Sequence, residues 1–157
     1  YKRQFTTQDD MYVGNYIQPC TPELALEVGL NLRFEDKREA EQTTGLHAPA
    51  AVLQAHLNST YSVFFKVPNG KTAGVAGVTS SHAIWMLCTD ASTEYPHTFV
   101  REAKRWIASL SNPYLHNYAD MRNEQHIKLL KLLKFNFLNY TVYNGVPLIE
   151  FYKLCVQ

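Results

Sequence analysis

Histidine and cysteine side chains are the residues of this sequence best suited to act as bases, nucleophiles or metal ligands. The sequence has 6 histidines and 3 cysteines, but no histidine pair has HxxxH or HxH spacing and no CxxC occurs. We therefore expect no metal site and no disulfide framework, and reduced thiols in a cytosol fit this pattern. Cys88 ends an apolar run without a flanking base, which indicates a buried, inert thiol. A structural or surface role is expected for His82, His97, His116 and His126.

The segment Gly70-Lys71-Thr72 resembles the end of a phosphate-binding P-loop, GxxxxGK[ST]. The first glycine of that motif is missing, because its position holds Phe65. Asn69-Gly70 is instead typical of a tight hairpin turn, and we interpret the segment in that way.

A third group of residues is suited to binding rather than to catalysis. Lys128, Lys131 and Lys134 recur along one predicted helix and could meet nucleic acid or an acidic protein surface. A solvated helix face is the alternative, and the net charge of +1 does not favour nucleic acid. Aromatic residues near the ends of predicted elements are further interface candidates. The interface candidates are Tyr95, Tyr114, Tyr118, Lys128 and Lys131.

The composition indicates one globular domain. The chain has 157 residues, of which 46% are hydrophobic, and this is enough for a core of ordinary size. Residues 1–10 are polar and show no signal-peptide core, so we expect an arm there and a single domain over 11–157. No apolar run is long enough to span a bilayer.

The first half of the sequence predicts one strand, helices and then three strands. A first strand near Tyr12–Gln18 ends at Pro19, and Thr21 caps the next helix. Charged residues over 36–43 and a periodic segment at 48–57 are also helical, with Gly45 between them. The three strands are Tyr61–Val67, Thr72–Thr79 and His82–Cys88.

The second half alternates helices with strands. Phe99, Ala103 and Ile107 recur at helical spacing within Thr98–Leu110, and Asn123 is a natural cap for a second helix. The remaining elements are Tyr114–Met121, Glu124–Lys134, Phe137–Tyr143 and Leu148–Cys155. The resulting order, β-α-α-β-β-β-α-β-α-β-β, predicts an α/β (α+β) mixed sheet flanked by helices, with a parallel pair inside it.

This order resembles the GNAT acetyltransferase fold. In this family the later helix often has the sequence pattern Asn-x-x-Ala-Ile-x-Leu-Tyr-x-x-x-Gly-Phe. In this sequence the framework positions match at Asn123, Ile127, Leu129 and Phe135, and three functional or small positions do not.

A narrower resemblance covers about 20 residues. Asn117-Tyr118, Asn123, His126-Ile127, Leu130-Lys131 and Phe137 look like the same segment of a small GNAT-like internal virion protein of short-tailed phages. The resemblance implies a role in particle assembly and no transferase reaction.

The GNAT resemblance implies a glycine-rich turn after the fourth strand, where bare amides hold the pyrophosphate of acetyl-CoA. The matching segment, Thr89–Thr98, reads TDASTEYPHT. It has no glycine, and Asp90 and Glu94 would repel phosphate at close range. If the cofactor does bind, the resemblance points to Leu87, Cys88, Thr89, Thr98 and Asn123.

The family also uses a tyrosine on the later helix to protonate the leaving thiolate. Leu130 occupies that position and cannot donate a proton, and Tyr140 and Tyr143 lie on a predicted strand. We therefore expect no catalytic residue and no cofactor.

Two hypotheses follow. The first is a non-enzymatic GNAT-like phage protein that contacts phage structural proteins, in the virion or in the infected host cytoplasm. The second is an active N-acyltransferase that uses acetyl-CoA through an atypical pyrophosphate loop.

Overall fold

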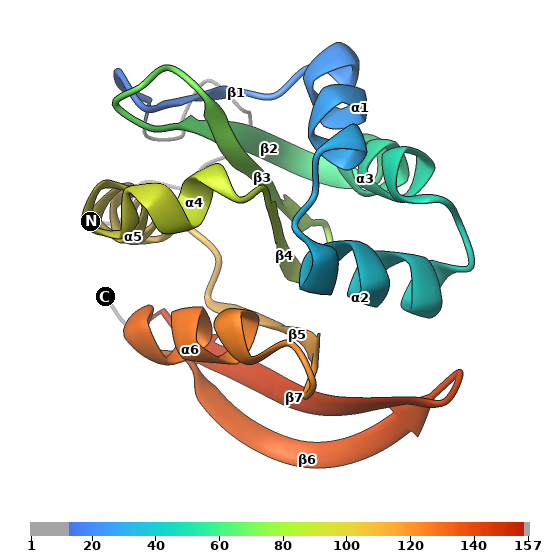
Figure 1. The fold of residues 1–157 in the computed structure, drawn as a ribbon. Helices are drawn as coiled ribbons and strands as arrows, with labels where there is room; N and C mark the ends of the chain where they lie inside the picture. Colours follow the sequence, from blue (N-terminus) through green and yellow to red (C-terminus); the bar gives the residue numbers. More distant parts are fainter. Residues whose placement is uncertain (1–12, 156–157) are drawn as a thin grey trace.

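The computed structural model describes residues 13–155, which form two antiparallel sheets flanked by helices (Figure 1). The first sheet has the strand order β1-β2-β3-β4, and the second has the order β5-β7-β6. The strands of the first sheet are β1 (Ile17–Pro19), β2 (Ser59–Lys66), β3 (Thr72–Thr79) and β4 (Ile84–Cys88). Those of the second are β5 (Tyr114–Asp120), β6 (Asn136–Tyr143) and β7 (Val146–Leu154).

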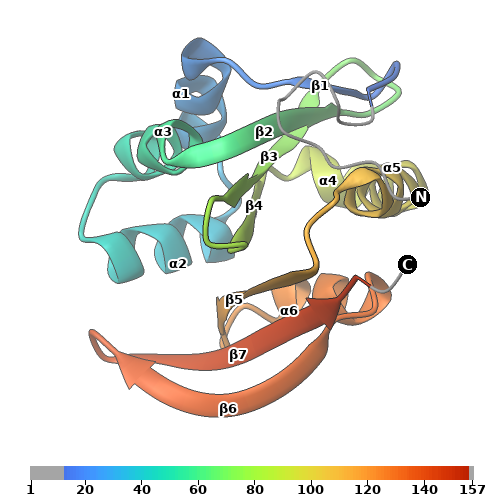
Figure 2. The ribbon, with the colours of Figure 1, turned by 180° about the vertical axis from the view of Figure 1, so that it is seen from behind.

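The helices fall into three groups along the chain, which Figure 2 shows from behind. Three helices connect β1 to β2, two connect β4 to β5, and one connects β5 to β6. They are α1 (Pro22–Leu30), α2 (Phe34–Thr44), α3 (Ala48–Leu57), α4 (Ala91–Glu94), α5 (Pro96–Ser109) and α6 (Glu124–Leu132).

The predicted fold class is confirmed, and several details differ. The predicted order counts two helices between β1 and β2 and one between β4 and β5, whereas the structure has three and two. The predicted first strand is shorter than expected and includes Pro19, which lies opposite Val63 at the edge of the sheet. The arm predicted at residues 1–10 lies outside the described residues, and the single domain over 11–157 stays a prediction.

The predicted parallel pair is reduced to one bridge. Ala83 and His116 form an isolated parallel bridge, and the Asn117 side-chain amide donates to the Ile84 carbonyl at 2.9 Å. Beyond these contacts β4 and β5 diverge, as Figure 1 shows. The two sheets therefore touch at the beginnings of these strands, and a wedge opens towards Cys88 and Asp120.

The larger core fills the space between the first sheet and helices α5 and α6. Phe65 packs edge-on against Phe99 and Trp106, with ring centroids 5.3 and 6.2 Å apart. The amphipathic pattern predicted for α5 is confirmed, since Ala103 and Trp106 are fully buried. A second cluster lies between α1, α3 and the other face of the first sheet. Strand β4 thus packs against apolar side chains on both faces.

Helix α1 approaches α3 closely at Gly29. A Cβ atom at Gly29 would lie 2.4 Å from the Pro49 Cα, which is a backbone atom and cannot rotate away. Although alanine favours helices over glycine by about 1 kcal/mol, we expect Gly29→Ala to lower the free energy of unfolding by about 1–3 kcal/mol. Urea denaturation measures this change, and exposed Leu30→Ala on the same helix is the control. An unchanged or higher stability of Gly29→Ala would contradict the close packing.

Candidate functional site

The end of β4 makes its hydrogen bonds within the protein. The Cys88 amide donates to Asp36 Oδ2 at 2.7 Å, and the Cys88 carbonyl accepts from the Arg33 amide at 3.0 Å. The Thr89 amide donates to the Ala73 carbonyl at 2.9 Å. This end of the strand is therefore closed by the N-terminal part of α2 and by β3.

The turn after β4 also satisfies its own amides. The Ala91 amide donates to Thr89 Oγ1 at 3.3 Å, and the Ser92 amide donates to the Thr89 carbonyl at 3.2 Å. The Thr93 amide donates to the Asp90 carbonyl at 3.1 Å. A cradle for phosphate needs amides that point at the ligand without partners, and these three amides are already used.

Carboxylates surround the same turn. Asp90 and Glu94 are exposed, and together with Glu27 they line a cavity of about 540 Å³ beside it. Lys71 offers partial compensation at 3.9 Å from Glu94. The repulsion of phosphate that the sequence predicts is consistent with this geometry.

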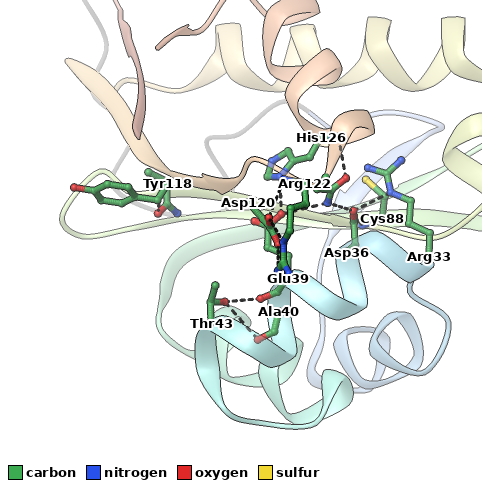
Figure 3. A network of polar contacts seen from close by, with 12 residues as sticks. Arg33, Asp36, Glu39, Ala40, Thr43, Cys88, Tyr118, Asp120, Arg122 and His126 are labelled. Atoms are coloured by element: carbon green, nitrogen blue, oxygen red, sulfur yellow. Dashed lines mark hydrogen bonds and ion pairs between the residues drawn. The ribbon is translucent and has the colours of Figure 1, made fainter. Parts of the chain in front are cut away.

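Asp36 spans the wedge between the two sheets (Figure 3). One carboxylate oxygen, Oδ2, accepts the Cys88 amide of β4. The other, Oδ1, accepts from Asn123 Nδ2 at 2.8 Å and from Arg33 Nε at 2.9 Å. Asp36 is 2% exposed and Asn123 is fully buried. A single carboxylate thus joins the end of β4 to the start of α6.

Arg33 completes this bridge. Its guanidinium also donates to Gln125 Oε1 at 2.7 Å, so it links the beginning of α2 to α6. Burial opposes its charge, but the neighbouring acidic groups, including Asp36, raise the pKa of Arg33 above its usual value. Burial raises the pKa of the Cys88 thiol to about 12, so the expected inert thiol agrees with its surroundings.

A cavity of about 540 Å³ lies beside the bridge, between α2, α3, β4 and the β6–β7 hairpin. Its walls are mostly apolar, with Trp85, Met86 and Phe151 among them. His126 and Glu39 supply an ion pair on its wall, with His126 Nδ1 at 3.3 Å from Glu39 Oε1. Asn123 Nδ2 donates to the same oxygen at 3.2 Å. A mostly apolar cavity with a few convergent polar groups is typical of a ligand site.

The ion pair shifts the titration of His126. Burial disfavours the imidazolium, but the Glu39 carboxylate outweighs burial and raises the pKa of His126 above its usual value. Near the same face of α2, burial acts to raise the pKa of Asp120, and hydrogen bonds from Arg122 lower it overall. The Arg122 guanidinium lies 2.7 Å from Asp120 Oδ2 and also donates to Gln42. The Glu39–His126 pair therefore links α2 to α6, and the hydrogen bond from Arg122 to Gln42 links α2 to the segment after β5.

The structure brings most of the predicted cofactor residues together. Leu87, Cys88 and Thr89 end β4, and Asn123 faces Cys88 across the Asp36 carboxylate. Thr98 lies in the first turn of α5. Leu130 is buried in the core with Ile107 and Leu133.

The interface candidates lie on different elements. Tyr114 and Tyr118 are 42% and 45% exposed on β5, whereas Tyr95 is partly buried and packs against the core. Lys128 and Lys131 are exposed on α6.

Sequence reasoning missed Arg33, Asp36 and Glu39 as functional positions. They lie in or next to residues 36–43, whose pattern predicts a charged helix and nothing more. Their i, i+3 spacing puts them on one helix face, but their partners lie 52 to 92 residues away. Among the described residues, no group of three or more His, Cys, Asp or Glu side chains is placed to hold a metal ion. No described helix is long and apolar enough to cross a membrane.

Comparison with known proteins finds matches among solved structures. No family model matches this sequence, and neither does any curated protein. A GNAT-family acetyltransferase from Streptococcus pneumoniae aligns with a TM-score of 0.57 and 17% identity, over 88% of this chain and 97% of its own. A GNAT-family acetyltransferase from Bacillus cereus aligns with a TM-score of 0.61 and 10% identity, over 90% and 97%.

A third match is a spermidine N-acetyltransferase from Vibrio cholerae, with a TM-score of 0.57 and 10% identity over 88% of this chain and 94% of its own. This chain has the GNAT fold. At these identities the likeness establishes the fold alone. None of the three is a phage protein, so the resemblance of this GNAT-fold chain to virion proteins rests on its residues 117–137 alone.

Asp36 tests the importance of the bridge for stability. We expect Asp36→Asn to lower the free energy of unfolding by about 3–5 kcal/mol, because it leaves Arg33 without its buried counter-charge and turns one acceptor into a donor. Urea denaturation measures the change. Exposed Asp90→Asn is the matched control, with an expected change within about 0.5 kcal/mol. Equal stability of the two variants would show that the bridge is dispensable.

The raised pKa of His126 predicts that its contribution to stability depends on pH. Its pKa is raised in the folded protein, so its contribution to stability is complete below the unfolded value of about 6.5 and is lost as pH rises through the folded pKa. The difference in unfolding free energy between the wild type and His126→Gln should therefore shrink as pH rises through that range.

The cause of the His126 shift is tested separately. An NMR titration should show the pKa of His126 falling in Glu39→Gln, because the neighbouring negative charge is removed. His97→Gln, at an exposed position, is the control for the stability measurement. A His126 pKa that does not respond to Glu39→Gln would remove the ion pair as the cause.

Proposed function

We propose that this GNAT-fold domain acts through protein–protein contacts and does not transfer acetyl groups from acetyl-CoA. The observation that supports this proposal is the Asp36 bridge. Its carboxylate binds both the Cys88 amide and the Asn123 side chain, two of the groups that the GNAT resemblance assigns to the cofactor. With the Ala91, Ser92 and Thr93 amides of the following turn also used, the residues present do not fit the cofactor.

The resemblance to virion proteins of short-tailed phages supplies the class of partner. In this proposal the chain contacts phage structural proteins, in the particle or in the infected host cytoplasm. Tyr118 supports a binding surface, because this large aromatic side chain is 45% exposed within the resembling segment. Lys128 and Lys131 add exposed positive charge on the neighbouring helix.

N-acyl transfer is the second candidate. The structural neighbours favour it over the first, since they are described as acetyltransferases. The cavity also favours it, because His126 with its Glu39 partner has the arrangement of an oriented base beside a space for an acceptor. For this function the Asp36 bridge must open when acetyl-CoA enters.

Isothermal calorimetry with acetyl-CoA separates the two candidates. We expect no saturable heat at millimolar cofactor, because bound amides and two carboxylates meet the phosphates. Asp90→Asn/Glu94→Gln is the matched variant, since it removes the repulsion and leaves the bridge intact. Saturable binding by the wild type would overturn the first proposal. Binding by the variant alone would assign the loss to charge rather than to the bridge.

The choice of partner has its own test. A tagged chain should retain structural proteins from purified short-tailed phage virions, and Tyr118→Ala should retain less. Lys104→Ala, an exposed lysine on α5, is the control. Retention of no structural protein would remove the virion assignment without affecting the calorimetric result.

A further inference from the structure

Strand β6 is an edge strand, and after a register irregularity between Phe137 and Tyr140 its last four residues lack the usual protection against pairing with another strand. In the order β5-β7-β6, it pairs only with β7 among the described strands, and its other side is the outer margin of the described part of the chain in Figures 1 and 2. Its sequence, NFLNYTVY, contains no charged residue and no proline. Edge strands of stable monomers are normally blunted by lysine, proline or a covering element.

The same strand exposes large apolar side chains. Leu138 is 50% exposed, Tyr140 69%, Val142 70% and Tyr143 54%. Large exposed apolar groups on one continuous element mark an interaction surface rather than scattered surface residues. Aromatic and β-branched side chains are also the ones that stabilise cross-strand pairs.

The backbone at this edge is oriented for pairing. The Pro147 carbonyl accepts from the Met121 amide at 2.9 Å, so it points to β5 and away from β6. Val142 lies opposite Pro147, so this is a non-hydrogen-bonded pair, and the N–H and C=O of Val142 point outwards. Tyr140 lies opposite Ile149, two residues along the strand, so its N–H and C=O also point outwards.

We propose that β6 pairs with β6 of a second copy of this chain, antiparallel and with Thr141 on the two-fold axis. This register places Tyr140 of each copy opposite Val142 of the other, so that the outward groups of both residues bond in symmetric pairs. An uncharged strand is complementary to itself, because no like charges meet across the axis. The net charge of the chain is only +1, so the copies repel each other weakly. This inference does not depend on whether the domain transfers acyl groups.

Sedimentation equilibrium of the full chain up to about 1 mM tests the pairing. We expect a monomer–dimer equilibrium. The Tyr140→Lys/Val142→Lys variant places two lysines opposite each other at both pairs and should weaken the dimer by about tenfold or more. Leu30→Lys, which changes another exposed apolar residue on α1, should leave it unchanged.

A charge-complementation experiment identifies the occupant as this strand. The Tyr140→Glu/Val142→Glu variant should also be monomeric, and an equimolar mixture with the lysine variant should regain a dimer. Circular dichroism of each variant verifies the fold. A monomeric wild type at all concentrations, or a dimer that survives in the lysine variant, overturns the proposal.

Cross-linking tests the register. In a Cys155→Ser background, Thr141→Cys should form an intermolecular disulfide on mild oxidation, because non-hydrogen-bonded partners have Cα atoms about 4.5 Å apart. Cys20 and Cys88 are buried, and burial raises their thiol pKa values to about 11 and 12, so they do not compete. Val13→Cys, at an exposed position far along the sequence, is the control. Equal cross-linking of both variants would overturn this register.

Discussion

The carboxylate of Asp36 is the interaction on which the shape of the wedge depends. Two antiparallel sheets meet at the start of β4 and β5, and the Asp36 bridge joins them at the other end. Asp36 supplies it with three hydrogen bonds, from the Cys88 amide, from Asn123 and from Arg33. A buried charge is tolerable only when it is paired and fully hydrogen-bonded. Arg33 is the counter-charge of Asp36, and its guanidinium also donates a hydrogen bond to Gln125 on α6.

The bridge also lets side chains of the protein itself connect the two halves of the GNAT fold. In this chain the groups at the wedge receive their hydrogen bonds from α2, so the space between the sheets is stabilised from within. The large cavity lies to one side of the bridge, where Glu39 and His126 face it. The chain thus retains a ligand-sized cavity beside a hydrogen-bonded frame.

The sequence predicted local features better than long-range ones. Thr21 and Asn123 cap helices as expected, because the capping hydrogen bond reaches only three residues ahead. The strands of the first sheet were predicted from apolar runs and from the turn at Gly70. The division of the sheets could not be predicted, because it depends on how β4 and β5 diverge in space. The roles of Arg33, Asp36 and Glu39 could not be predicted for the same reason. Helix periodicity predicts the face on which a charged side chain lies but not the distant residue that it contacts.

The sequence separations within the bridge have a consequence for the order of folding. Asp36 bonds to residues 52 and 87 positions away, so its contacts close large loops. The hairpins β2–β3 and β6–β7 need only local turns and can form early. The carboxylate bonds are therefore expected to form later than the hairpins, and the φ-value of Asp36 should be near zero in a chevron analysis.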